Sequence, residues 1–366
     1  MTDPENIQFT FADMFAGIGG MRYAFEKVNG KCVFTSEKDE YALKTYSRNF
    51  DIADHVVNKD ILEIGSSDEW TYDKVPDFDV LVAGFPCQPY SIAGLRQGLT
   101  DVRGGDIFVK LIEVLYNKKP KAFLLENVAG LDRHNGGVTY EYMEQQLTDA
   151  GYWVFKNLMN TKDYTHVPQN RPRLFIIGLS KTLYPQKPEV KDMSELHNFE
   201  KHEPEKPRMA LEFDEIELWP GKHQYTDSIQ AYLENEVDEK YYYTDPEGNP
   251  IFECSKELQE QMKLRDTLYQ WRRKYVRENK DKKCPTLTAN MGSGGHNVPL
   301  LLDAAGRIRK LTPRECANFQ GFGKERFEFP PNMPDSRCYH QIGNSVTVPL
   351  ISKIAEKLIW VMRNGE

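Results

Sequence analysis

The sequence predicts an α/β protein with a doubly wound sheet and a second, smaller domain. Strand and helix signals alternate through the first half of the chain, as a doubly wound sheet requires. After Leu183 this periodicity weakens, and prolines, acids and tyrosines dominate. The length of 366 residues is also long for one compact core. We therefore expect one large α/β domain and one smaller domain.

The elements of the large domain follow one another in pairs. A strand near residues 9–12 leads through a glycine turn into a helix over residues 21–28. Further pairs of strand and helix are expected at 32–36 and 41–50, at 80–84 and 107–116, and at 122–126 and 140–150. The segments 153–160 and 173–179 follow, and the second is a continuous apolar run typical of a buried strand.

Two helices are expected near the C-terminus. Thr312 is suited to an N-cap, Pro313 to the first helical position and Glu315 to the acid of a capping box, so a short helix begins there. Residues 349–363 are amphipathic and predict a final helix.

Cysteine usage and the absence of long apolar runs narrow the class of protein. None of the six cysteines stands in a C-x-x-C pair or beside histidines at metal-ligand spacing, so neither a metal site nor a disulfide framework is expected. The polar, acidic N-terminus and the lack of an apolar run of membrane-spanning length argue against a signal peptide and a membrane helix. We expect a protein of the reducing cytoplasm.

The net charge of −8 hides a strong local contrast. Residues 263–283 hold nine Lys and Arg against three Asp and Glu, whereas residues 186–260 hold eight against twenty. Contact with phosphate depends on the local field and not on the sum of charges. The basic run therefore predicts a segment packed on the protein with Arg272 and Arg273 directed at DNA. The alternative is a solvated helix face.

One cysteine stands in a rigid turn after an apolar strand. Cys87 lies between Pro86 and Pro89 within GFPCQPYS, and prolines at these positions exclude a regular helix or a central strand. The thiol is therefore expected at a strand end, where ligands reach parallel α/β sheets. This placement indicates a nucleophile, and the alternative is a buried structural cysteine.

A glycine turn predicts a nucleotide-like ligand. Gly17, Gly19 and Gly20 follow a strand and open a helix, where the chain comes close to a ligand that a Cβ atom would obstruct. Glu37 ends the next strand and can accept hydrogen bonds from ribose hydroxyls. On spacing alone, NAD or FAD fits almost as well as other nucleotide cofactors.

Six segments together resemble the DNA (cytosine-5)-methyltransferases of the prokaryotic or phage, restriction-modification type. They are FADMFAGIGG (11–20), the Cys87 segment, LLENV (124–128), QNRPRLFIIG (169–178), RKLTPRECANFQGF (309–322) and QIGNSVTVPL (341–350). The resemblance implies a Rossmann-like, S-adenosylmethionine-dependent methyltransferase fold. It places the catalytic and cofactor-binding domain in residues 1–183 plus 345–366. Residues 184–344 would then form the target recognition domain and hinge.

The same resemblance implies methyl transfer from S-adenosylmethionine to C5 of a flipped cytosine in a short duplex DNA sequence. Cys87 would add to C6, Glu126 would donate a proton at N3, Arg173 would bind O2 and Arg171 would position Glu126 and the loop. The alternatives are that Glu126 is a capping acid and that both arginines lie on the surface.

The resemblance also assigns the cofactor contacts. Phe15 would pack beside the adenosyl group, Asp60 and Ile61 would contact adenine, and Asn344 to Val346 would close over the methionine end. Asp60 could instead be a turn acid. The implied cofactor residues, for S-adenosylmethionine and its product S-adenosylhomocysteine, are Phe15, Gly17, Gly19, Gly20, Glu37, Asp60, Ile61, Pro86, Asn344, Ser345 and Val346.

Double-stranded DNA is the implied partner of a monomer that associates with the nucleoid. A companion restriction endonuclease would act independently. The implied DNA contacts come from the Cys87 loop, the basic run and the polar loop 284–299, and they are Gln88, Ser91, Arg272, Arg273, Thr286, Asn290 and Ser293.

Three alternative functions stay open at this point. A tRNA cytosine-5 methyltransferase would use the same catalytic segments, although the long region after Leu183 is larger than that group usually shows. A catalytically inactive DNA-binding homologue is disfavoured by the intact Cys87, Glu126 and Arg173. A dinucleotide-dependent oxidoreductase would bind a nicotinamide or flavin cofactor.

Overall fold

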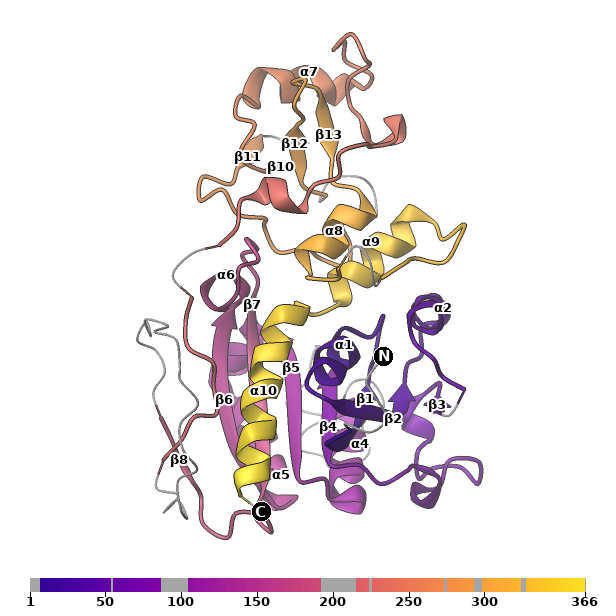
Figure 1. Ribbon diagram of the computed structural model, residues 1–366, viewed down its shortest axis with the longest axis vertical. Coiled ribbons are helices and arrows are strands. Elements are labelled where there is room, and N and C mark those ends of the chain that lie inside the picture. The colour runs from indigo at the N-terminus through magenta and orange to yellow at the C-terminus, as the bar shows by residue number, and fades with distance from the viewer. Residues whose placement is uncertain are drawn as a thin grey trace.

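The computed structural model describes residues 7–53, 55–86, 105–191, 215–223, 226–272, 275–292, 298–323 and 327–365. Its centre is a seven-stranded sheet of order β3-β2-β1-β4-β5-β7-β6 (Figure 1). Every neighbouring pair is parallel except those that β7 makes with β5 and β6. The strands are β1 (Phe9–Met14), β2 (Gly30–Ser36), β3 (Val56–Asn58), β4 (Val80–Gly84), β5 (Ala122–Val128), β6 (Tyr152–Asn160) and β7 (Pro172–Ser180).

The strand order confirms the predicted doubly wound sheet. The chain winds outward from β1 to β3, then returns to the middle and continues from β4 in the other direction. The order therefore reverses between β1 and β4, and ligands of open α/β sheets bind beyond the carboxyl ends of the strands at such a point.

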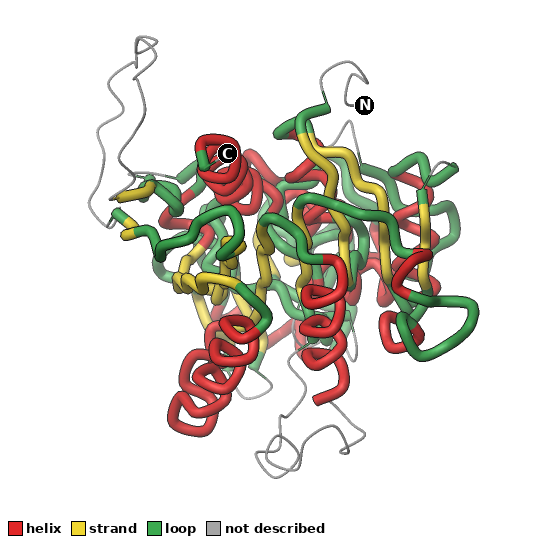
Figure 2. Tube along the Cα trace, turned by 90° about the horizontal axis from the view of Figure 1, so that it is seen from below, coloured by secondary structure: helices red, strands yellow, loops and turns green. Residues whose placement is uncertain are grey.

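Helices cover both faces of this sheet (Figure 2). Because successive side chains of a strand point to opposite faces, each strand contributes to two apolar layers. Phe11, Val80 and Leu124 belong to the layer with α1 (Gly20–Lys27) and α10 (Val348–Asn364). Ala12, Leu81 and Leu125 belong to the layer with α4 (Gly105–Lys118) and α5 (Val138–Asp149). The C-terminal helix thus packs beside the first helix of the chain.

A second, four-stranded antiparallel sheet lies apart from the first (Figure 1). Its order is β11-β10-β12-β13, with β10 (Tyr269–Trp271), β11 (Val276–Glu278), β12 (Leu300–Leu302) and β13 (Ile308–Lys310). Helix α7 (Glu253–Gln261) covers it, and Leu258, Tyr269, Leu300 and Ile308 form a small core of their own.

The remaining elements are short or connect the two sheets. Helices α8 (Pro313–Phe319) and α9 (Asp335–Asn344) lie between the two sheets (Figure 1). The others are α2 (Glu40–Asn49), α6 (Thr161–Tyr164), β8 (Glu189–Val190), β9 (Glu215–Ile216) and the 3₁₀ turns Ile61–Glu63, Tyr72–Lys74, Ala129–Gly137, Ile229–Tyr232 and Glu239–Tyr241. No helix among the described residues is long and apolar enough to cross a membrane.

The predicted elements of the large sheet are confirmed, with ends that differ by a few residues. The capping box is confirmed too, because Thr312 Oγ1 accepts from the Glu315 amide at 3.1 Å and a Glu315 carboxylate oxygen accepts from the Thr312 amide at 2.8 Å. The alternative of a helix for the basic run is wrong. Its described part contains β10 and β11, which pair as an antiparallel hairpin.

Asp13 is a carboxyl group in the middle of the sheet core. Its side chain is fully buried on β1, and this burial raises its pKa to about 8, although the guanidinium of Arg22 acts in the opposite direction. The folded protein therefore holds the Asp13 proton more tightly than the unfolded chain does. The resulting stabilisation of the folded state is complete below pH 3.8, the ordinary pKa of this side chain. It is lost as the pH rises to about 8, the pKa of Asp13 in the folded protein.

We predict that Asp13→Asn removes this pH dependence, because an amide of the same shape does not titrate. The Tm of the variant minus that of the wild type should rise between about pH 5 and about pH 9. Thermal unfolding across this range measures the difference. A constant difference would contradict the assignment.

Candidate active site

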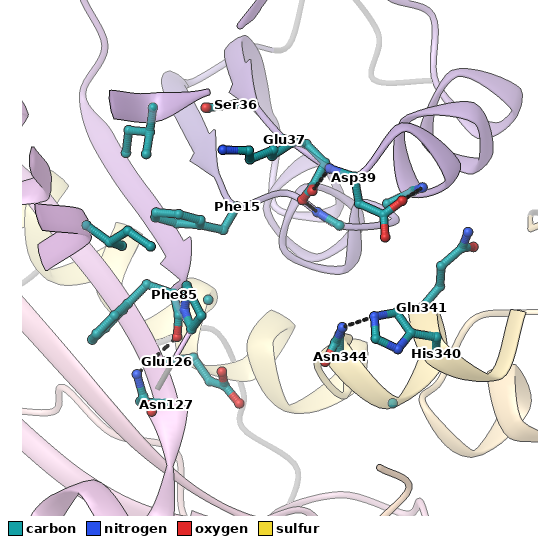
Figure 3. A pocket seen from close by; sticks show the side chains of 18 of the residues that line it. Phe15, Ser36, Glu37, Asp39, Phe85, Glu126, Asn127, His340, Gln341 and Asn344 are labelled. Carbon is teal, nitrogen blue, oxygen red and sulfur yellow. Dashed lines mark hydrogen bonds between the residues drawn. The ribbon is translucent and has the colours of Figure 1, made fainter. Parts of the chain in front are cut away.

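A cavity of about 660 Å³ lies beyond the carboxyl ends of β1, β2, β4 and β5. This size is within the roughly 300–1,000 Å³ typical of small-molecule sites. Helix α9 forms the opposite wall, with His340 and Asn344 across from Glu37 and Asp39 (Figure 3). The predicted site residues on its lining are Phe15, Gly17, Glu37, Asp60, Ile61, Pro86, Glu126, Arg171, Arg173 and Asn344.

The turn after β1 brings the backbone to the cavity. Phe15 has a left-handed φ of 58°, a conformation that costs a non-glycine residue about 1–3 kcal/mol, and its ring lines the cavity. Gly17 also has a positive φ of 57°, and no atom lies within 4 Å of the position that its Cβ would occupy. The turn therefore leaves open space for a ligand beside its backbone.

Four other predicted cofactor residues contact protein and do not line this cavity. A Cβ on Gly19 would lie 2.1 Å from the ring of Phe50. A Cβ on Gly20 would lie 2.8 Å from Val346 and 2.9 Å from Ser345. The absence of a side chain at these glycines is therefore explained by packing, and Ser345 and Val346 are buried against the turn.

Glu37 is held in one orientation by the backbone. One carboxylate oxygen accepts from the Gly17 amide and the other from the Asp39 amide, each at 2.7 Å. Burial raises the pKa of Glu37, and these backbone hydrogen bonds partly offset that effect. Each carboxylate oxygen can accept a second hydrogen bond, so the group can still bind two hydroxyls.

Asp60 combines a turn role with a place on the cavity wall. It caps the turn Ile61–Glu63 by accepting from the Leu62 amide at 3.1 Å, and it pairs with Lys38 at 2.6 Å. Burial acts to raise the pKa of Asp60, but the hydrogen bonds from Lys38 and Leu62 outweigh it and hold the pKa below its ordinary value. Sequence reasoning did not identify Lys38.

Glu126 and Arg173 face each other on neighbouring strands. Glu126 lies on β5 and is 8% exposed, and Arg173 Nε lies 2.9 Å from its Oε1 atom. The antiparallel register of β5 and β7 places Val128 opposite Arg173, which brings the guanidinium near the strand end. Arg173 is therefore a cavity residue and not a free surface arginine.

Arg171 has a different role from its neighbour. Its side chain is 2% exposed and donates to the backbone carbonyls of Leu287 at 2.8 Å and Gly343 at 3.2 Å, and also to that of Ser345. Burial lowers its pKa well below the ordinary value. Its hydrogen bonds go to the loop around Leu287 and to the end of α9, and the charge of Glu126 acts on it without a hydrogen bond. That Arg171 positions Glu126 stays a prediction.

Two further residues of the site were missed by sequence reasoning. Asn127 donates to the Phe85 carbonyl at 3.1 Å and so fixes the end of β4 (Figure 3). His340 lines the cavity, and its Nε2 atom lies 3.1 Å from the Asn344 side-chain amide nitrogen (Figure 3). Each is adjacent to a segment or residue that carried a prediction, but only the fold reveals its contacts.

The predicted DNA contacts are only partly described. Thr286 Oγ1 donates to the Asn170 carbonyl at 2.6 Å, and the exposed Asn290 accepts from Thr288 at 2.7 Å. Arg272 is exposed beside β10 and donates to the Gln270 side chain at 3.2 Å. The predicted residues that lie outside the described residues are Cys87, Gln88, Ser91, Arg273 and Ser293.

Comparison with known proteins gives consistent matches along nearly the whole chain. A family model described as C-5 cytosine-specific DNA methylase matches residues 9–360. The Type II methyltransferase M.Bsp6I of Bacillus sp. (strain RFL6) is 40% identical over 350 residues, which cover 95% of this chain and 97% of that protein. The Type II methyltransferase M.HpaII of Haemophilus parainfluenzae is 33% identical over 371 residues, with 98% and 91% covered.

Solved structures share the fold. The Dnmt2 methyltransferase of S. pombe superimposes with a TM-score of 0.66 at 18% identity and covers 97% of this chain and 99% of its own. A putative DNA modification methyltransferase encoded within an E. coli prophage superimposes with a TM-score of 0.61 at 19% identity. Likeness at this level of identity supports the architecture alone.

The two arginines of the site should differ in their effect on stability. Arg171→Ala leaves three backbone carbonyls without their donor, and an unsatisfied buried polar group costs about 1–3 kcal/mol. We expect the free energy of unfolding to fall by at least about 2 kcal/mol, and by less for Arg173→Ala, whose side chain faces the cavity. Urea denaturation measures both values. Equal losses would contradict the separate roles.

Proposed function

The chain belongs to the C-5 cytosine-specific DNA methylase family, and we propose that it methylates a cytosine flipped out of a short, specific duplex DNA sequence, through a covalent bond between Cys87 and C6. It is a DNA (cytosine-5-)-methyltransferase of the restriction-modification type. The observation that carries the finer proposal is the pairing of Glu126 with Arg173 in the cavity that Glu37 also lines.

S-adenosylmethionine fits the cavity as the cofactor. The open space beside Gly17 admits a ligand close to the backbone, and the fixed carboxylate of Glu37 can accept from the ribose hydroxyls. Phe15, Asp60 and Ile61 would hold the adenosine, and Asn344 the methionine end. When bound, this group supplies the methyl.

Cys87 is the proposed nucleophile, and the other cysteines support this choice by their surroundings. Burial raises the pKa of every one of them, which disfavours the reactive thiolate. For Cys32 and Cys338 burial raises the pKa to about 12. The five are Cys32, Cys254, Cys284, Cys316 and Cys338.

Three side chains have separate roles in the proposed reaction. The thiolate of Cys87 adds to C6, Glu126 donates a proton at N3 as negative charge develops there, and Arg173 hydrogen-bonds O2. The ring becomes an enamine that is nucleophilic at C5 and accepts the methyl. Loss of the C5 proton to a base, β-elimination of the Cys87 thiolate and return of the N3 proton to Glu126 release the methylated base.

The target base must leave the stacked duplex to reach this cavity. We assign Gln88 and Ser91 to the space that the flipped base vacates, and Arg272 and Arg273 to phosphate contacts. Thr286 would contact phosphate near the flipped base, and Asn290 and Ser293 would read the bases. The exposure of Arg272 and Asn290 supports this assignment.

We propose that residues 184–344 form the target recognition domain and hinge, with 1–183 and 345–366 as the catalytic domain. The separate core beneath α7 supports a distinct outer part. Trp219, Phe319 and Ile342 nevertheless belong to the core that includes α1 and α10. The part of residues 184–344 that contains these three side chains therefore shares the core of the large domain. We propose further that the protein acts as a monomer in the cytoplasm, independently of any companion restriction endonuclease.

The test measures transfer of a tritiated methyl group from S-adenosylmethionine to duplex DNA and, in parallel, to tRNA. We expect transfer to DNA alone, and bisulfite sequencing of the product should locate the modified cytosine. Glu126→Gln should lower turnover by about 10²- to 10⁴-fold, because an amide cannot donate the proton as a carboxylic acid does. Binding of S-adenosylhomocysteine should survive this change. Transfer to tRNA alone, or near-normal turnover of Glu126→Gln, would contradict the proposal.

A further inference from the structure

Helix α9 separates the cavity from the loop of residues 284–292. On one side, Asn344 lines the cavity. On the other side, the loop packs so closely that a Cβ on Gly343 would lie 2.2 Å from the backbone of Thr288. The loop is anchored by the buried side chains of Leu287 and Met291. Helix α9 therefore contacts both the proposed cofactor cavity and the loop that we propose to lie on DNA.

The side chain of His340 bridges these two surfaces. Its Nδ1 atom lies 3.2 Å from the carbonyl oxygen of Ala289 in the loop, and its Nε2 atom lies 3.1 Å from the amide nitrogen of Asn344. The carbonyl can only accept and the amide nitrogen can only donate. With the Asn344 amide in this orientation, Nδ1 donates to the Ala289 carbonyl and Nε2 accepts from Asn344.

The two hydrogen bonds of His340 therefore have opposite roles: the ring donates in one and accepts in the other. Asn344 is exposed toward the cavity, and its amide group is oriented by the imidazole that accepts from it. Asn344, His340 and Ala289 thus form one continuous chain of hydrogen bonds from the cavity to the loop. Next to Ala289, Asn290 is exposed and its side chain is fixed by Thr288 at 2.7 Å.

We propose that His340 is a positioning residue that couples occupancy of the cofactor cavity to the DNA-contacting loop. The inference rests on the proposed function, because it takes S-adenosylmethionine and duplex DNA as the two ligands. Linkage requires reciprocity: DNA raises the affinity for the cofactor product by the same factor by which the product raises the affinity for DNA.

The chain permits two half-replacements of the imidazole. Asn places an amide nitrogen near the position of Nδ1, so His340→Asn can keep the bond to Ala289 and loses the one to Asn344. Gln places an amide oxygen near the position of Nε2, so His340→Gln can keep the bond to Asn344 and loses the one to Ala289. Coupling through His340 needs both bonds, so each variant should lose it.

The experiment measures the Kd of S-adenosylhomocysteine by calorimetry, with and without a duplex that contains the sequence methylated by the wild type. The wild-type ratio of the two Kd values should be at least about fivefold, the lower end of typical coupling. In both variants this ratio should fall to within about twofold of one, whatever change the substitution makes in the Kd measured without DNA, because the ratio compares two Kd values of the same variant. Ser336→Ala, at an exposed position one turn earlier on α9, serves as the matched control and should keep the wild-type ratio.

The outcomes separate this inference from the proposed function. If the wild type methylates DNA and either variant retains the full ratio, or if the wild type shows no coupling, the role of His340 is refuted while the methyltransferase assignment stands. If the wild type methylates no DNA, the proposed function fails first. A variant that still binds S-adenosylhomocysteine in the absence of DNA is folded, so loss of its ratio supports the inference.

Discussion

The architecture depends on one buried guanidinium. Arg171 is 2% exposed, and its donors bind carbonyls of the loop at Leu287 and of the α9 end at Gly343 and Ser345. A buried charge of this kind is tolerated only where hydrogen bonds replace water. The geometry of the loop and of α9 is therefore fixed relative to the start of β7, because any separation would leave both the charge and the carbonyls unsatisfied.

The side-chain amides of nearby glutamines add further buried hydrogen bonds between the segments that join the two sheets. Gln169 donates to the Phe319 carbonyl at 2.7 Å, and Gln320 donates to the Ile342 carbonyl at 2.9 Å and accepts from Thr347 at 3.1 Å. All of these polar side chains are buried. Two residues beyond Arg171, strand β7 presents Arg173 to Glu126. The buried contacts of Arg171 and the proposed chemistry of Arg173 thus lie two residues apart, just before and within β7, and the bond to Gly343 connects Arg171 to α9.

Local signals were sufficient for most of the large sheet, because its longer strands are apolar runs that alternate with helical segments. They missed β3, which has only three residues. They also placed Glu37 and Glu126 at strand ends, where the sheet brings them to one cavity. The second sheet was not predicted, since strands of three residues such as β10 carry little periodicity. Turn glycines look alike in a sequence, so only the contact with Phe50 separates Gly19 from Gly17. The Arg171 contact with Leu287 spans 116 positions and has no local signature.

The most direct test of the central claim is a duplex with 5-fluorocytosine at the target position. Fluorine cannot leave C5 as a cation, so after methyl transfer the bond from Cys87 to C6 cannot be eliminated. A denaturant-stable adduct should form, and its mass shift should map to the peptide that contains Cys87. Cys87→Ala should form no adduct and transfer no methyl, yet still bind DNA. An adduct that persists in this variant, or that maps to one of the other five cysteines, would contradict the account.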